Sequence, residues 1–308
     1  MQRRNFLYQS ILGSSAALAS TQPVLARPAD KADNKAVRSF TCDYAPHFGM
    51  FENTAGKDLI DQLKYMHDQG FRSLEDNGMM ARPVDEQEKI GKELNRLGMR
   101  MGVFVIDGGD NWKVSLTAGK QEFVDFFVAT CRKAIEVGKR CNAKWATVVP
   151  GYFERKLPVE IQAANVIRAM RFGAEVLEPA GLAMVMEPLS DNPDLFLRNS
   201  NQAYMVAKAV NSPSCKILFD IYHMQRNEGD LIVNIDACYD ELGYVQIGDN
   251  PGRKEPGTGE VNYKNIFQHL YKKGYKGVFG MEHGKSKDGK EGEAALVQAY
   301  READSFAV

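Results

Sequence analysis

Short apolar runs alternate with amphipathic segments along most of the chain. Eight short runs are strand-like and mostly rich in apolar residues, as in parallel strands buried on both faces, and a segment of helical periodicity follows each one. The expected strands cover residues 38–44, 71–75, 99–106, 145–149, 182–186, 216–219, 244–247 and 277–281. The expected helices cover residues 57–69, 85–97, 121–140, 158–178, 201–210, 230–242, 262–273 and 292–305.

Eight strand–helix units in succession predict an α/β fold, a single (β/α)8 TIM barrel. An open doubly wound sheet is the alternative, because it has the same alternation of strands and helices. Such a sheet carries a glycine-rich phosphate turn after an early strand. The pair Gly108-Gly109 follows the third expected strand but lacks the spacing of that turn. The pattern therefore favours the barrel.

The first residues have the pattern of an export signal. Arg3-Arg4-Asn5-Phe6-Leu7 is a twin-arginine pattern, a mostly apolar stretch follows, and Val24-Leu25-Ala26 has the small-residue ending of a cleavage site. The pattern predicts a cleavable twin-arginine signal peptide over residues 1–26, a flexible leader over 27–36 and the barrel over 37–308. The apolar stretch is shorter than the ~20 residues of a membrane span. We expect a periplasmic protein, exported in the folded state, without stable membrane insertion after cleavage.

Composition and charge narrow the class of partner. The chain is 44% hydrophobic and 26% charged, as in an ordinary globular domain, and its formal net charge is -1. A near-neutral chain with no basic run beyond its first residues is not expected to bind nucleic acid. The five cysteines are dispersed without metal-type spacing, so we interpret them as small buried hydrophobic residues. We expect a small-molecule substrate, and the sequence leaves a homo-oligomer open.

Four of the expected strands end in an oxygen-bearing side chain. The residues at these ends, from strands five to eight, are Glu187, Asp220, Gln246 and Glu282. Active sites of barrel enzymes lie at the C-terminal ends of the strands. Three carboxylates and an amide form an all-oxygen set, which suits Mg²⁺ or Mn²⁺ better than zinc. Three neighbouring carboxylates also need a cation, since their mutual repulsion would otherwise keep some of them protonated. We expect one divalent metal, Mg²⁺ or Mn²⁺, at these four residues.

Five segments carry more specific motifs. They are Gly70-Phe71-Arg72-Ser73-Leu74-Glu75, Met186-Glu187-Pro188-Leu189, Asp220-Ile221-Tyr222-His223-Met224-Gln225-Arg226, the glycine- and proline-rich run from Gln246 to Tyr263, and Gly280-Met281-Glu282. With these motifs the chain resembles the hydroxypyruvate isomerase family, within the xylose isomerase-like and tagatose epimerase-like sugar isomerases. The motifs cover most of the second half of the barrel, whereas the first half resembles the family mainly in pattern.

The resemblance implies that the four strand-end residues hold one divalent metal. It also implies that Glu187 and Glu282 act as the acid–base pair and that His223 and Arg253 contact the substrate. The chemistry agrees with these roles, because isomerising an α-hydroxy carbonyl compound moves a proton between neighbouring carbons through an enediolate. The expected activity is a metal-dependent aldose–ketose type isomerisation of hydroxypyruvate to tartronate semialdehyde, or of a related sugar.

Other residues at the expected mouth of the barrel are further candidates. Glu75 ends the second strand, with Asp76 and Asn77 beside it, and is a candidate substrate contact. All three are candidates to line the mouth, although a polar cap for the next helix explains them nearly as well. For His223 and Arg253 the alternatives are a structural histidine and a solvated loop charge. Aromatic residues in the expected loops are suited to stacking on a sugar, namely Tyr44, Phe48, Phe51, Trp112 and Tyr152.

Other functions stay open at this stage. A lyase or dehydratase acting on a keto-sugar would use the same metal and enediolate. The export pattern and the segment Ile106-Asp107-Gly108-Gly109, where the family has a histidine-bearing segment, favour that alternative. A non-catalytic sugar-binding barrel would bind its ligand without moving a proton. An endonuclease relative would need a histidine-rich multi-zinc site, and the five histidines lie mostly off the strand ends.

Overall fold

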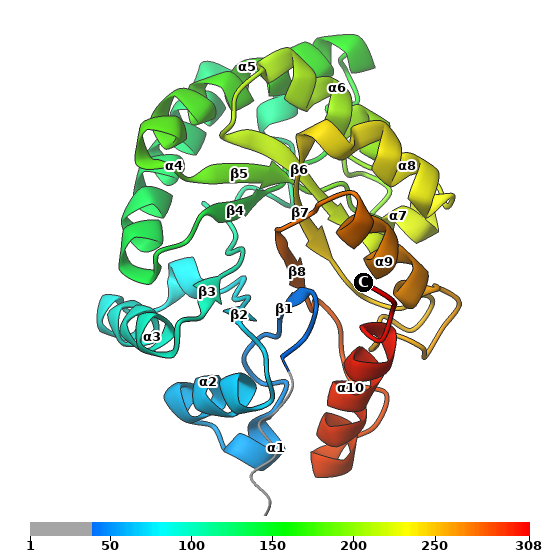
Figure 1. Cartoon of the computed structure of the whole chain (residues 1–308). Coiled ribbons are helices and arrows are strands. Elements are labelled where there is room, and N and C mark those ends of the chain that lie inside the picture. The colour runs from blue at the N-terminus through cyan, green and yellow to red at the C-terminus, as the bar shows by residue number, and fades with distance from the viewer. Residues whose placement is uncertain (1–38) are drawn as a thin grey trace, which may run out of the picture. The chain divides into compact units, whose positions relative to one another are not determined.

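Parallel strands lie at the centre of the structure and helices surround them (Figure 1). The computed structural model describes residues 39–308, so the expected signal peptide and leader, residues 1–26 and 27–36, lie outside the described residues. The strands are β1 (Asp43–Ala45), β2 (Ser73–Leu74), β3 (Arg100–Met101), β4 (Trp145–Val148), β5 (Ala183–Met186), β6 (Cys215–Asp220), β7 (Leu242–Gln246) and β8 (Val278–Gly280).

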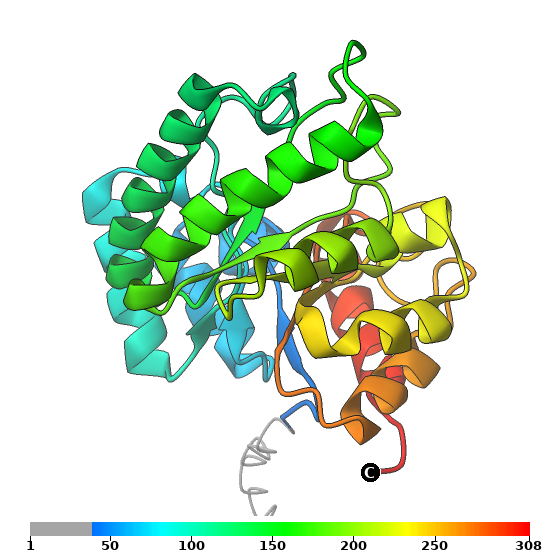
Figure 2. The same ribbon diagram turned by 90° about the horizontal axis from the view of Figure 1, so that it is seen from above.

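The helices lie outside the strands, also in the view from above (Figure 2). They are α1 (Glu52–Ala55), α2 (Leu59–Asp68), α3 (Val84–Leu97), α4 (Gln121–Cys141), α5 (Val159–Leu177), α6 (Ser200–Val210), α7 (Ile221–Asn227), α8 (Leu231–Cys238), α9 (Tyr263–Lys272) and α10 (Gly289–Ala303). Local sequence explains several helix ends. The Asp58 carboxylate accepts the first free N–H groups of α2, and Gly98 ends α3 with a φ of 66°. Within residues 39–308, none of the helices combines the length and the apolar character that a membrane crossing requires.

The strands form a TIM-barrel-like fold. A regular parallel ladder joins six of them in the order β1-β8-β7-β6-β5-β4, and β2 pairs with β3. Single parallel bridges, His47 with Glu75 and Val105 with Thr147, connect this pair to the chain beside it on either side. The regular part of β2 and of β3 is two residues long, shorter than the expected strands over 71–75 and 99–106. Apolar runs predict burial rather than ladder hydrogen bonding, and the residues after β3 are indeed buried.

Apolar packing between the strands determines where the polar side chains at the strand ends point. One buried apolar cluster combines residues from most of the strands, namely Ala45, Val103, Val185, Leu218, Tyr244 and Val278. Side chains alternate between the two faces of a strand, so a residue two positions later points the same way. Leu218 is followed by Asp220 in β6, and Tyr244 is followed by Gln246 in β7. The apolar layer therefore directs both polar side chains into the interior, one layer nearer the mouth.

The five cysteines are free and buried, which confirms their interpretation as small hydrophobic residues.

Candidate active site

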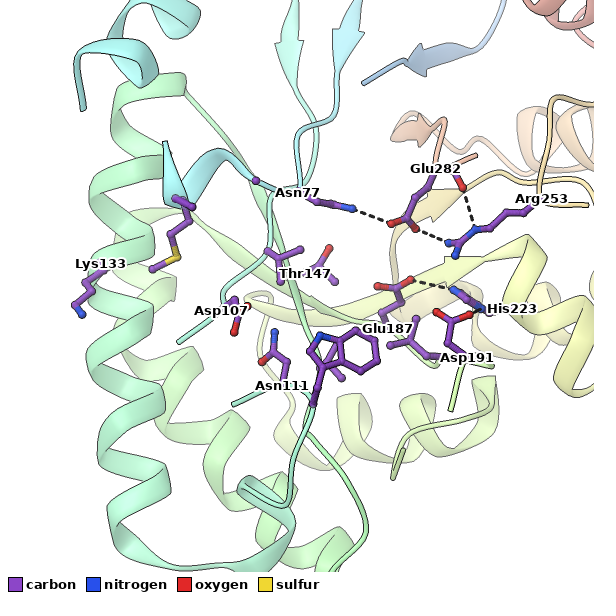
Figure 3. A pocket seen from close by; sticks show the side chains of 17 residues that line it. Asn77, Asp107, Asn111, Lys133, Thr147, Glu187, Asp191, His223, Arg253 and Glu282 are labelled. Carbon is purple, nitrogen blue, oxygen red and sulfur yellow. Dashed lines mark hydrogen bonds and ion pairs between the residues drawn. The ribbon is translucent and has the colours of Figure 1, made fainter. Parts of the chain in front are cut away.

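A cavity of about 560 Å³ opens at the C-terminal ends of the strands. Four residues predicted for the site line it, namely Glu187, His223, Arg253 and Glu282. Figure 3 shows these four on one side of the cavity and Asp107, Asn111 and Lys133 on the other. Asp220 and Gln246 lie beneath the first group and are essentially inaccessible to solvent.

Asp220 ends β6 and caps the helix that follows. Its Oδ1 accepts the backbone N–H groups of Tyr222 at 2.7 Å and His223 at 3.4 Å, which begin α7. Its Oδ2 faces the site and lies 3.0 Å from Arg253 Nη2. Helix α7 was not predicted from the sequence, in which this run was expected to be a strand end followed by a loop. The signal that would have revealed it is the N-cap itself, an aspartate directly before an apolar helical turn.

Gln246 is the register partner of Asp220 on the neighbouring strand. Its Nε2 donates to Glu75 Oε1 at 2.7 Å, and Tyr244 Oη donates to Glu75 Oε2 at 3.0 Å. Gln246 Oε1 is buried and has no hydrogen-bond partner among the described residues. Glu75 is 2% exposed and lies behind Gln246, where it borders a smaller neighbouring cavity. Its predicted contact with substrate stays a prediction.

Glu282 follows β8 and has a partner on each side. Asn77 Nδ2 donates to its Oε1 at 2.8 Å, and Arg253 Nη2 donates to its Oε2 at 2.9 Å (Figure 3). The guanidinium of Arg253 also lies over the ring of Tyr222, 4.9 Å from its centroid. One guanidinium therefore bridges Glu282 and Asp220. The contact of Asn77 was not predicted, because its only sequence signal is its position two residues after Glu75.

His223 is fully buried beside Glu187. Its Nε2 lies 3.8 Å from Glu187 Oε1 and 3.6 Å from Asp220 Oδ2. The backbone N–H of Ser190 donates to its Nδ1 at 3.2 Å, so the neutral ring carries its proton on Nε2. Burial lowers the pKa of His223, which favours this neutral form. The arrangement presents an N–H donor to the site.

Buried carboxylates dominate the electrostatics of the site. Burial raises the pKa of Glu187 well above its usual value, and the charges of Glu282 and Asp220 raise it further. Burial also raises the pKa of Glu282 to about 7, although Arg253 opposes this shift. Burial and the charge of Glu282 also raise the pKa of Glu75. The site concentrates more negative charge than Arg253 neutralises.

The residues present fit a divalent cation. Glu187 Oε1 and Gln246 Oε1 are buried oxygens without a partner among the described residues, and such atoms require an explanation. Oxygen atoms of Glu187 and Asp220 lie within 4.8 Å of one another. An oxygen-rich set of this kind suits a hard divalent ion.

The five aromatic residues expected at the mouth of the barrel lie in different environments. Tyr44 lies in β1 rather than in a loop, and Phe51 lies in the loop before α1 with its side chain in the core. Both are fully buried, so the expectation that their rings line the mouth was wrong. Phe48 borders the smaller cavity beside Glu75, and Tyr152 packs against a small apolar cluster. Trp112 lines the main cavity and is 52% exposed. Trp112 is therefore the expected aromatic residue that reaches this cavity.

Comparison with known proteins identifies relatives of this arrangement. Residues 63–303 match the family described as xylose isomerase-like TIM barrel. Hydroxypyruvate isomerase of Escherichia coli (strain K12) is 32% identical over 178 residues, 57% of this chain and 67% of that protein. The 2-oxo-tetronate isomerase of Pectobacterium atrosepticum is 26% identical over 240 residues, 75% of this chain and 89% of that protein.

The fold is shared with solved structures at low sequence identity. The 3-keto-D-glucoside 4-epimerase YcjR from E. coli superposes with a TM-score of 0.70 at 18% identity, covering 86% of this chain and 100% of that chain. At this identity the likeness concerns the fold alone.

Proposed function

Because the chain belongs to the xylose isomerase-like TIM barrel family and is an isomerase, we propose that it is a metal-dependent isomerase of an α-hydroxy carbonyl compound that works through an enediolate. The observation that carries the proposal is a pair of carboxylates after the ends of β5 and β8, Glu187, which is buried, and Glu282, which is half-buried. Asp220 and Gln246 occupy the ends of the two strands between them.

In the proposal, four residues would hold the cation, namely Glu187, Asp220, Gln246 and Glu282. The partnerless oxygens of Glu187 and Gln246 support this set. A divalent cation, when bound, would polarise the carbonyl and hydroxyl oxygens of the substrate and stabilise the negative charge that develops on them. Mg²⁺ and Mn²⁺ are the ions that the oxygen-rich set favours.

Glu187 and Glu282 are the proposed acid–base pair. One carboxylate takes the proton from the carbon that bears the hydroxyl group; the C–H electron pair forms the C=C bond of the enediolate and the carbonyl π pair moves onto the carbonyl oxygen. A proton then returns to the former carbonyl carbon, the hydroxyl proton passes to the former carbonyl oxygen, and the old hydroxyl oxygen becomes the new carbonyl, so atoms and electrons balance without an oxidant. A carboxyl group with a pKa of about 7, as burial produces at Glu282, is suited to either role at neutral pH.

His223 and Arg253 are the proposed substrate contacts. The Nε2–H of His223 is directed into the site and has no hydrogen-bond partner among residues 39–308. Arg253 uses its Nε and Nη2 on Glu282 and Asp220. No protein partner is found in the described part of the chain for its Nη1, which is free to bind a substrate carboxylate or hydroxyl group.

Hydroxypyruvate, 2-oxo-tetronate and larger keto-sugars are the substrate candidates. The seven non-hydrogen atoms of hydroxypyruvate would fill roughly 200 Å³ even at about 30 Å³ each, the share of a water molecule in the liquid. The cavity is more than twice that size and extends to Trp112 and Asn111. This extent favours a substrate larger than hydroxypyruvate, such as a keto-sugar, on which a lyase or dehydratase with the same site is the second candidate function. An export route to the periplasm is likewise a proposal and rests on the pattern over residues 1–26.

Metal depletion and replacement test the proposed function. The chelated protein is assayed with hydroxypyruvate, 2-oxo-tetronate and keto-sugars, before and after addition of Mg²⁺, Mn²⁺ or Zn²⁺. Isomer formation that depends on the metal is the expected result. Full activity in protein shown by elemental analysis to hold no metal would refute the proposal. Release of water or an alcohol from a keto-sugar would assign the lyase alternative instead.

A further inference from the structure

Glu75 lies under the candidate metal site and is enclosed by the barrel. Both of its carboxylate oxygens accept a hydrogen bond, Oε1 from Gln246 Nε2 at 2.7 Å and Oε2 from Tyr244 Oη at 3.0 Å. A Cβ atom at Gly280 would lie 1.7 Å from Glu75 Oε2. The carboxylate therefore fits because residue 280 has no side chain.

The contact with Glu75 determines which end of the Gln246 amide faces the site. An amide side chain has an NH₂ donor and a carbonyl acceptor on opposite sides of its plane. Because Nε2 donates to Glu75, Oε1 is directed away from it, and this oxygen is buried without a partner among the described residues. The reversed amide would place the carbonyl oxygen against a carboxylate oxygen, which is repulsive.

We propose that Glu75 is a positioning residue that holds the amide oxygen, rather than the amide nitrogen, of Gln246 toward the metal. The inference rests on the proposed function, since it assigns a role within the same metal site. A carboxylate presents an oxygen to the metal in both orientations of its plane. An amide presents its oxygen in one orientation and its NH₂ group in the other. A site that uses Gln246 between Asp220 and Glu282 therefore needs a fixed acceptor behind the amide, and Glu75 supplies it.

Metal affinity in three variants tests this role without an activity assay. In Glu75→Leu the amide of Gln246 loses its acceptor, and we expect Mn²⁺ affinity to fall by about 10- to 100-fold, as for other groups that orient metal ligands. Glu75→Gln keeps an acceptor oxygen for Gln246 and can donate to Tyr244 Oη, so most of the affinity should return. Tyr244→Phe is the matched control, because it removes the other hydrogen bond of Glu75 and should cost less than 10-fold.

The decisive comparison repeats Glu75→Leu in a Gln246→Glu background. Both oxygens of a glutamate at position 246 can bind the cation, so orientation no longer matters and the second substitution should not lower Mn²⁺ affinity. Affinity is measured by calorimetric titration, and thermal unfolding of the metal-free variants confirms that each is folded. Equal losses in both backgrounds, or no loss in either, would overturn the inference. Wild-type protein that binds neither Mn²⁺ nor Mg²⁺ would overturn the metal site of the proposed function as well, so the two failures are distinguishable.

Discussion

Arg253 holds Glu282 by two hydrogen bonds, from Nη2 to Oε2 at 2.9 Å and from Nε to the backbone carbonyl oxygen at 3.1 Å. The same Nη2 is 3.0 Å from Asp220 Oδ2. The guanidinium lowers the pKa of Glu282, but burial has the larger effect and raises that pKa to about 7. The charge of Glu282 therefore changes near neutral pH.

This shift predicts a pH-dependent stability of the metal-free protein. The native state keeps a proton on Glu282 up to a pH of about 7, whereas the unfolded chain releases it near 4.5. Between these values the native state binds more protons, so the free energy of unfolding falls as pH rises, by at most about 1.4 kcal/mol per pH unit for one proton. The contribution of Glu282 to the free energy of unfolding is complete below pH 4.5 and is lost as the pH rises through about 7. Denaturant unfolding between pH 5 and 8 with a chelator measures it.

The control for this measurement is Glu282→Gln, which cannot titrate. Burial lowers the pKa of His283 from 6.5 to about 4, so this histidine contributes in the opposite direction below pH 6.5. The histidines are present in both proteins, so the difference between the two curves reports Glu282 together with the effect of its charge on the pKa values of Glu187 and Glu75. Parallel curves for wild type and Glu282→Gln would show that Glu282 titrates normally.

Addition of metal should reverse the pH dependence. Carboxylate ligands must lose their protons before they bind a cation, so Mn²⁺ or Mg²⁺ should raise the melting temperature more at pH 8 than at pH 6. At a free metal concentration of 100 times Kd the stabilisation is about 2.7 kcal/mol. In Asp220→Ala, which lacks the carboxylate of β6, the metal should cause little stabilisation. Equal stabilisation of wild type and Asp220→Ala by metal would remove Asp220 from the ligand set.

Glu187→Gln and Glu282→Gln separate proton transfer from metal binding. The amide keeps an oxygen for the cation but cannot carry the proton, so kcat should fall by about 10²- to 10⁴-fold. Metal affinity, measured by calorimetric titration, should fall by much less. Activity losses that merely follow the loss of metal would assign both residues as ligands alone.

Trp112→Ala tests how far the substrate extends. Trp112 is half exposed and lines the cavity. Loss of its ring should raise KM for a hexose-sized keto-sugar by roughly 3- to 10-fold, the scale of about 1 kcal/mol of stacking, and leave KM for hydroxypyruvate unchanged. Phe172→Ala on α5 is the control, since Phe172 is 40% exposed but lines no part of this cavity. An equal effect on small and large substrates would show that the ring contributes no subsite for the distal part of a sugar.

The sequence predicted the second half of the barrel closely. The strands from β5 to β8 lie within about two residues of their expected ranges, because each is a short apolar run that ends at a polar residue. Asp220 and Gln246 are register partners, as expected for residues at equivalent strand ends.

Other features depend on contacts that one sequence does not show. Glu75 is held by Tyr244 and Gln246, about 170 residues away along the chain, and fits only beside Gly280. Nothing in the local pattern distinguishes such a residue from a helix cap. The aromatic residue Tyr44 was misplaced for a similar reason, since composition does not reveal which rings pack in the core.

Hydrogen exchange at carbon tests the central claim most directly. Each compound of a panel is incubated in D₂O with the protein and Mg²⁺, and its carbon-bound protons are followed by proton NMR. The panel contains hydroxypyruvate, tartronate semialdehyde, 2-oxo-tetronate, free ketoses and keto-sugars. We predict loss of a carbon-bound proton signal in at least one compound, dependent on the metal and abolished in Glu187→Gln. Absence of exchange across the panel, in protein shown by titration to hold its metal, would contradict enediolate chemistry at this site.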